Sequence, residues 1–227
     1  MNSLRTICTS LFFVFVSFSM YSQCSSNAAY IWTNTGPQPW NQPSNIIAMD
    51  AAFGAGNWDA LFFETLNPAS VFTGDQYGTI FIEGSDFGAN ELTTFLMANL
   101  PAIEAFVSAG GSLYLNAAPN EGGNINFGFG GVVLQYQPGV GPFTDCGIIT
   151  SPTHPVFDGI STTHFNASSF GHAIICPPGM NPTVLTENAN TGDDILIEIS
   201  FGSGTAIFGG LTSVSYTHLT LPTNREV

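Results

Sequence analysis

The chain has 227 residues, a sequence pI near 4.1 and a formal net charge of −14 at pH 7. Arg5 and Arg225, close to the two ends, are its only lysine or arginine residues. The sequence between them therefore has no Schiff-base lysine, no cationic clamp for phosphate or carboxylate, and no basic patch for nucleic acid or anionic lipid.

The N-terminus has the pattern of a secretory signal. An apolar run follows Arg5 and extends to Met20, and the small or polar residues Ser22 and Gln23 come next. The run is too short to cross a bilayer, so we expect a signal peptide at residues 1–22. The mature protein is then secreted or held at the cell surface, with no membrane span after cleavage.

Cys8 leaves with the signal, and the other three cysteines enter an oxidising compartment. They are Cys24, Cys146 and Cys176. Three cysteines allow one bridge and one unpaired thiol, and sequence alone does not fix the choice. We favour a Cys146–Cys176 disulfide because each residue borders a predicted strand.

The N-terminal half predicts alternating strands and helices. Residues 28–33 form an apolar first strand, and Ser44 can cap a helix over 45–53. Short apolar runs at 61–65 and 79–83 predict the second and third strands.

A βαβ unit follows the third strand. The helix begins at Asn90, and we expect Pro101 to interrupt it, so that a second short helix ends at Gly110–Gly111. The strand 112–116 comes next. Strand, helix and strand of these lengths predict two parallel strands joined by a crossover. The residues at helical spacing are Leu92, Phe95, Leu96 and Leu100.

Beyond Asn120 the chain becomes rich in glycine and short strands. Residues 202–204 read as the turn of a closing hairpin. The fold class is therefore α/β, a three-layer sandwich with a flavodoxin-like, mostly parallel sheet and an antiparallel C-terminal hairpin. The expected strands lie near 132–136, 147–149, 172–175, 183–186, 195–199 and 205–208.

The last residues look foreign to the domain. Residues 214–223 resemble one reading frame of a transposase adapter used to prepare sequencing libraries. We therefore expect residues 214–227 to be an artefact, and residues 24–213 to be one domain whose natural sequence is cut off.

The order of elements resembles the class I glutamine amidotransferase-like superfamily, in its trehalose-utilisation-protein-like and β-galactosidase-associated members. The strand 79–83 with Gly84, the helix ending at 109–111 and the strand 112–116 carry this resemblance. The stretch 154–160 is similar to the His-Pro-x-x-x-Gly-Leu/Ile motif of those members, and the strands around 202–204 resemble their closing hairpin.

The chain departs from the catalytic pattern of that superfamily. Catalytic members carry a cysteine at a sharp turn after the fourth strand and a His-x-Glu near the end. Here the turn reads Asn116-Ala117-Ala118-Pro119-Asn120, and the sequence contains no His-x-Glu. The resemblance therefore implies a non-catalytic domain, a binding or scaffolding module of a larger protein.

The carboxyl ends of the parallel strands are where a ligand is expected. Their amides, hydroxyls and carboxylates suit a glycan, a cell-surface component or, as the cofactor alternative, calcium. The same residue types are also common turn formers and helix caps. The candidate ligand-binding residues are Asn34, Glu83, Ser85, Asp86, Asn116, Asn120 and Glu121.

Two other functions stay open. Glu83 and Glu121 could be the acid and base of a carbohydrate-active hydrolase, which needs two facing carboxyl groups. A structural spacer is favoured if aromatic side chains fill the crevice, with Trp32, Phe127 and Phe129 the candidates. His154, His164 and His172 match no compact metal-binding spacing, so no metal site is predicted.

Overall fold

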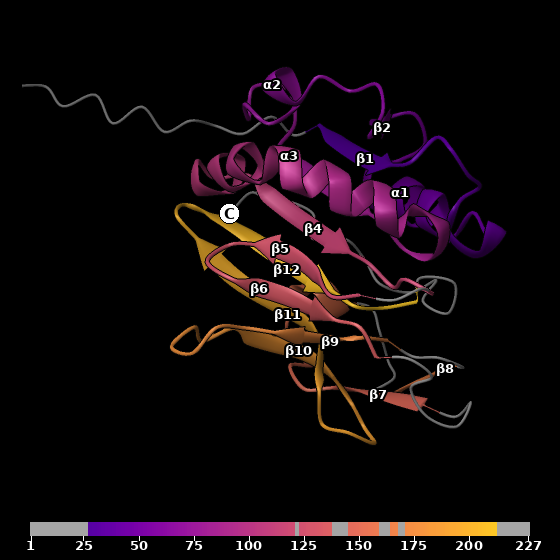
Figure 1. Ribbon diagram of the computed structural model, residues 1–227, viewed down its shortest axis with the longest axis vertical. Coiled ribbons are helices and arrows are strands. Elements are labelled where there is room, and N and C mark those ends of the chain that lie inside the picture. Colours follow the sequence, from indigo (N-terminus) through magenta and orange to yellow (C-terminus); the bar gives the residue numbers. More distant parts are fainter. Residues whose placement is uncertain (1–26, 121–122, 138–144, 159–163, 168–170, 213–227) are drawn as a thin grey trace, which may run out of the picture.

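The computed structural model describes residues 27–120, 123–137, 145–158, 164–167 and 171–212. A nine-stranded sheet lies at the centre, and helices and a second, three-stranded sheet pack against it (Figure 1). Within these ranges no helix has both the length and the hydrophobicity that a membrane crossing needs.

The strands are β1 (Ala28–Trp32), β2 (Trp58–Phe62), β3 (Thr79–Glu83), β4 (Ser112–Asn116), β5 (Ile125–Gly128), β6 (Val132–Gln135), β7 (Asp145–Ile149), β8 (His164–Ala167), β9 (Ala173–Ile175), β10 (Thr183–Asn188), β11 (Asp194–Phe201) and β12 (Gly204–Gly209). The helices are α1 (Ser44–Phe53), α2 (Pro68–Val71), α3 (Ala89–Ser108) and the 3-10 turns η1 (Pro39–Asn41), η2 (Asp86–Gly88) and η3 (Pro155–Phe157).

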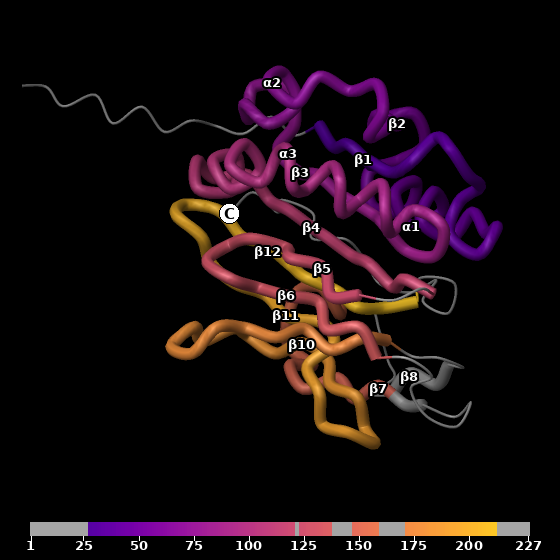
Figure 2. The backbone as a smooth tube through the Cα atoms, in the orientation of Figure 1, coloured from indigo at the N-terminus to yellow at the C-terminus, as the bar shows by residue number. Residues whose placement is uncertain are grey.

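The large sheet has a parallel half and an antiparallel half. Its order is β2-β1-β3-β4-β12-β11-β10-β7-β8, and the strands from β2 to β12 pair in parallel. Figure 2 shows β12 running beside β4, although the two are far apart in the sequence. The chain moves outward from β1 in both directions, so the switch point of the sheet lies between β1 and β3. The predicted three-layer α/β class is confirmed, and the antiparallel part extends beyond the hairpin to β10, β7 and β8.

One face of the sheet carries an aromatic row under α1. Tyr30, Phe81 and Tyr114 occupy the same register on β1, β3 and β4. Their rings stack with centroids 4.8 Å apart at each step. Met49 of α1 is buried against this row. The row fixes the distance between α1 and the strands, and thereby places the N-terminal turn of α1 over the ends of β3 and β4.

The opposite face is covered by α3 and the small sheet β5-β6-β9. Phe127 and Phe129 pack against Phe208 of β12 in this layer, with ring centroids 5.7 and 5.1 Å away. They lie in the core and do not fill the crevice at the end of the sheet. Trp32 stacks on Tyr30 under α1 instead. The condition that would favour a structural spacer is therefore not met by these three rings.

Several predicted boundaries were wrong. The helix α3 is continuous through Pro101. Proline has no N–H to donate to the carbonyl of Met97, four residues earlier, but Met97 lies on the exposed side of the helix, where water can replace that hydrogen bond. Ser44 is the first residue of α1 rather than its cap, and Pro43 precedes it. The second strand begins at Trp58, because β2 pairs along the whole of β1.

The predicted Cys146–Cys176 disulfide is also wrong, because Cys176 has a free thiol. Cys146 belongs to β7 in the large sheet, whereas Cys176 follows β9 in the small sheet and packs against the core beneath it. Cys24, the predicted signal peptide and residues 214–227 lie outside the described ranges.

Candidate functional site

The predicted ligand-binding residues follow β1, β3 and β4 at the carboxyl edge of the parallel half. Glu83, Ser85, Asp86, Asn116 and Asn120 are joined by hydrogen bonds within one network. Asn34 lies at the same edge but bonds elsewhere: its backbone N–H donates to Glu64 Oε2 at 3.0 Å. The predicted residue Glu121 lies outside the described ranges.

Glu83 is the centre of the network, and only 1% of its surface is exposed. Its Oε1 accepts a 2.7 Å hydrogen bond from the backbone N–H of Ser85. Its Oε2 accepts from the side-chain amides of Asn116, at 3.0 Å, and Asn45, at 3.3 Å. The Asn45 amide also donates to the Tyr30 hydroxyl at 3.0 Å. The carboxyl group thus ties together β1, α1, β3 and β4.

Asn116 connects this network to the end of the hairpin β11–β12. Its Oδ1 accepts from the backbone N–H of Leu211, and its Nδ2 donates to the Leu211 carbonyl, at 3.0 and 2.9 Å. Gly209 lies opposite Asn116 in the sheet, and a Cβ there would lie 2.5 Å from Asn116 Oδ1. Glycine is therefore required at 209 for the Asn116 side chain to reach Leu211.

A strained turn leaves β3 directly above Glu83. Asp86 has φ of 55°, and nearby Trp40 and Asn41 have φ of 52° and 55°, values that non-glycine residues adopt at a cost. Asp86 is held on three sides. Its backbone N–H donates to the Ala118 carbonyl at 3.1 Å, its Oδ2 accepts from the Trp40 N–H at 3.1 Å, and its Oδ1 accepts from the Asn120 amide.

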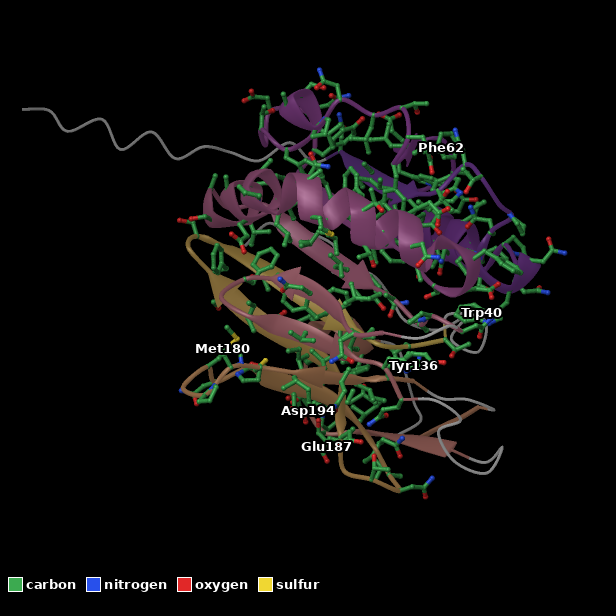
Figure 3. The ribbon with its side chains drawn as sticks, viewed as in Figure 1. Trp40, Phe62, Tyr136, Met180, Glu187 and Asp194 are labelled. Carbon is green, nitrogen blue, oxygen red and sulfur yellow. The ribbon has the colours of Figure 1, made fainter. Side chains whose placement is uncertain are left out.

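Aromatic side chains border this turn. Phe87, next to Asp86, is 68% exposed, which is unusual for a large apolar residue. Tyr136 donates from its hydroxyl to the Asn120 carbonyl at 2.9 Å and stacks on His172. Figure 3 shows Trp40 and Tyr136 at the same end of the molecule, beyond the end of β4. Sequence reasoning missed Trp40, Phe87 and Tyr136. Their position after the ends of strands was the signal that could have found them.

The electrostatics of the network follow from burial without a cation. Burial raises the pKa of Glu83 to about 7, against the lowering effect of hydrogen bonds from Ser85, Asn116 and Asn45. Burial, and next the charge of Glu83, raises the pKa of Tyr30 well above its ordinary range. A carboxyl group that changes charge near neutral pH therefore lies under the Asp86 turn.

His172 fastens the loops around the turn. Burial lowers the pKa of its imidazole, although a bond to the Pro119 carbonyl opposes this effect. Its Nδ1 accepts from the Gln137 backbone N–H at 3.0 Å, so the neutral ring carries its proton on Nε2, 3.0 Å from the Pro119 oxygen. The ring thus joins the loop after β4 to the loop after β6.

The network meets few of the requirements of catalysis or metal binding. In the described part of the chain, no three His, Cys, Asp or Glu side chains gather where they could hold a metal ion. Glu83 is closed to a substrate, and both oxygens of Asp86 already accept hydrogen bonds from protein donors. The buried carboxyl group of Glu83 is therefore not placed to touch a ligand.

Comparison with known proteins gives a fold and no more. No family model matches the chain, and no curated protein matches it. A ThuA-like protein from Bacteroides uniformis is 15% identical over 84% of each chain, with a TM-score of 0.53. A β-galactosidase from Rahnella is 13% identical with a TM-score of 0.51, and the match covers 84% of this chain but 30% of that one. A cytoplasmic protein from Salmonella typhimurium is 14% identical over 80% of this chain and 86% of that one, with a TM-score of 0.49.

Such low identities report shared architecture rather than shared chemistry. The chain shares the α/β fold of the Bacteroides uniformis ThuA-like protein.

Proposed function

We propose that this chain is an exported, non-catalytic amidotransferase-like domain that binds a glycan at the carboxyl edge of its sheet, as a module of a larger secreted or cell-surface protein. One observation carries the proposal: the polar groups beneath the edge bond to one another, whereas an exposed aromatic ring, Phe87, and an exposed amide, Asn120, lie beside the Asp86 turn. We call these accessible groups around the turn the rim; they offer contacts to a ligand without presenting a nucleophile.

The charge of the chain selects the kind of glycan. Arg5 and Arg225 are the only lysine or arginine residues, and the imidazole of His172 has a pKa lowered by burial. An acidic sugar would meet carboxylates such as Asp86, Glu64 and Glu91 with no cation to offset them. Uncharged sugars avoid this repulsion, and their C–H faces suit the negative faces of aromatic rings while their hydroxyls suit amides.

A screen on a glycan array tests the proposal, with neutral, sialylated and sulfated oligosaccharides printed side by side. We expect binding to neutral oligosaccharides only. Phe87→Ala should weaken that binding at least about tenfold, because the ring is lost from the rim. Met97→Ala is the matched control, since Met97 is 80% exposed on α3, away from the edge. Equal loss in both variants, or a preference for acidic glycans, would contradict the proposal.

The alternative function, a carbohydrate-active hydrolase, is tested with the same protein. It requires Glu83 to reach a glycosidic bond, but this carboxyl group is enclosed by Ser85, Asn45 and Asn116. Incubation with the neutral oligosaccharides that bind on the array should release no reducing sugar. Turnover that disappears in Glu83→Gln would establish the hydrolase instead.

A further inference from the structure

Every polar group that hydrogen-bonds to Glu83 donates to it. These are the Ser85 backbone N–H, the Ser85 hydroxyl and the amides of Asn116 and Asn45. The Asn116 amide cannot turn round, because its oxygen is already held by the Leu211 N–H. Donors on all sides match a carboxylate, which only accepts, and do not match a carboxylic acid, which must also donate.

No positive charge supports that carboxylate among the described residues that pack around it. The titratable groups that face it are Tyr30 from β1 and Tyr114 from β4, and both have pKa values raised by burial and next by Glu83 itself. The helix α1 contributes the neutral Asn45, and the end of the hairpin contributes Gly209 and Leu211. Asp86 lies above on the turn, with its carboxylate bonded to Trp40 and Asn120.

A proton added to Glu83 must find an acceptor in this shell. Two hydroxyl oxygens belong to the hydrogen-bond network around Glu83. One is Ser85 Oγ, which already accepts from the Ala118 N–H at 2.9 Å and from Asn116 at 3.3 Å. The other is the Tyr30 hydroxyl, which accepts from Asn45 and donates to Gln38. If either hydroxyl accepts the proton, it gives up a hydrogen bond that now joins two parts of the chain. A change at Ser85 reaches the turn directly, because Ser85 precedes Asp86.

We infer that Glu83 is the positioning residue of the rim. Its ionised form, acting through Ser85, holds the Asp86 turn and the loop after β4 in the arrangement that binds the ligand, and its protonation releases them. This inference rests on the proposed function for its consequence, which is that glycan binding weakens as pH falls below neutral. The effect of Glu83 protonation on the turn does not depend on the proposed function.

Amide spectra of the uniformly 15N-labelled chain from pH 5 to pH 9 test the inference without a ligand. We expect the amides of Ser85 and Asp86 to shift together, with a common midpoint near pH 7. Glu83→Gln should abolish the step. Asp75→Asn removes an exposed carboxylate after α2, at the amino edge, and should retain it. The wild-type titration decides the matter alone if Glu83→Gln does not fold.

A second arm measures binding of the neutral oligosaccharide with the strongest array signal. Wild type and Asp75→Asn should lose about tenfold in affinity between pH 8 and pH 5.5, a common size for coupling between two sites. Glu83→Gln should show no such pH step. A wild-type protein without the amide step, or a step that survives in Glu83→Gln, would overturn the inference. Intact amide steps without binding of any glycan would refute the proposed function only.

Discussion

Two tyrosine–carboxylate clusters lie toward opposite edges of the parallel half of the sheet. At the carboxyl edge, Glu83 is linked through Asn45 to Tyr30, and the group is closed to solvent. At the amino edge, the Tyr77 hydroxyl donates to Asp59 Oδ2 and accepts from Gln76 Nε2, both at 2.8 Å. Asp59 is exposed and borders a cavity of about 500 Å³, also lined by Asn27, Ala28, Phe53, Gly56, Asn57 and Trp58.

The difference shows what burial does to a carboxyl group when no cation is present. Water can solvate Asp59, which is exposed. Burial, and next the hydrogen bond to Asp59, raise the pKa of Tyr77 to about 12. At the other end protein donors replace water, yet desolvation still raises the pKa of Glu83 to about 7. The amino edge is thus a solvated cluster, and the carboxyl edge is a network in which each member depends on the others.

Removal of Asn116 should give the largest effect on this contrast. Asn116→Ala leaves Glu83 short of a donor and both backbone groups of Leu211 without partners. We expect the free energy of unfolding to fall by roughly 4 kcal/mol, because several buried groups lose their hydrogen bonds at once. Urea denaturation measures it. Asn57→Ala at the amino edge removes one exposed bond and should cost less than about 1 kcal/mol; similar losses at both edges would contradict the contrast.

The next effect is a pH dependence that belongs to Glu83. In the unfolded chain its pKa is 4.5, and in the fold it is about 7, so the unfolded state releases the proton first as pH rises. The contribution of this carboxyl group to stability is therefore complete below pH 4.5 and is lost as pH rises through 7. The loss amounts to about 3 kcal/mol.

The measurement is the free energy of unfolding of wild type minus that of Glu83→Gln at each pH. The difference cancels opposite contributions from other groups, such as Glu64, whose pKa is lowered by Thr33 and Asn34 donors despite its slight burial. This difference should decline between pH 4.5 and pH 7 and be flat above pH 8. The control repeats the comparison with Asp59→Asn present in both proteins, and the difference should then follow the same curve. A difference that does not change with pH would show that the Glu83 carboxyl group is solvated.

A smaller contrast concerns the two tyrosine hydroxyls. Tyr30→Phe deletes a buried group that accepts from Asn45 and donates to Gln38, each at 3.0 Å, and should cost about 2 kcal/mol. Tyr77→Phe deletes a hydroxyl whose partners Asp59 and Gln76 are exposed, and should cost below about 1 kcal/mol. Thermal unfolding of both variants at one pH compares them, and a reversed order would refute the solvation difference.

The sequence was a good guide to the fold where burial is uniform. The strands β1 and β3 are buried at every position, so their apolar runs matched the structure closely. Prediction failed where tertiary pairing overrides local pattern. The exposed residues Asp59 and Ala60 hid the start of β2, and Pro101 hid the continuity of α3.

The position of the site could be predicted from the sequence, but the burial of its central carboxyl group could not. The switch-point rule located Glu83, Asp86 and Asn116 at one edge, because parallel strands end together. Nothing in the residue types distinguishes a buried carboxylate from an exposed one, and Glu83 was expected to face a ligand. Its enclosure depends on Asn45 from α1, which is 38 residues away in the chain. The strained backbone at Trp40 and Asp86 leaves no sequence signal either, since neither is glycine.

The smallest expected effect arises from the whole surface rather than from one edge. Within the described ranges the one ion pair is His154 with Glu198, 3.3 Å apart, and it needs a protonated imidazole. Repulsion among acidic side chains is therefore largely uncompensated, and the screening length falls from about 10 Å at 0.1 M salt to about 3 Å at 1 M. The melting temperature at pH 7.5 should rise by a few degrees over this range, and the rise should shrink at pH 4, where exposed carboxylates are partly protonated. A flat or falling response at pH 7.5, or an equal rise at both pH values, would mean that this fold tolerates its charge without screening.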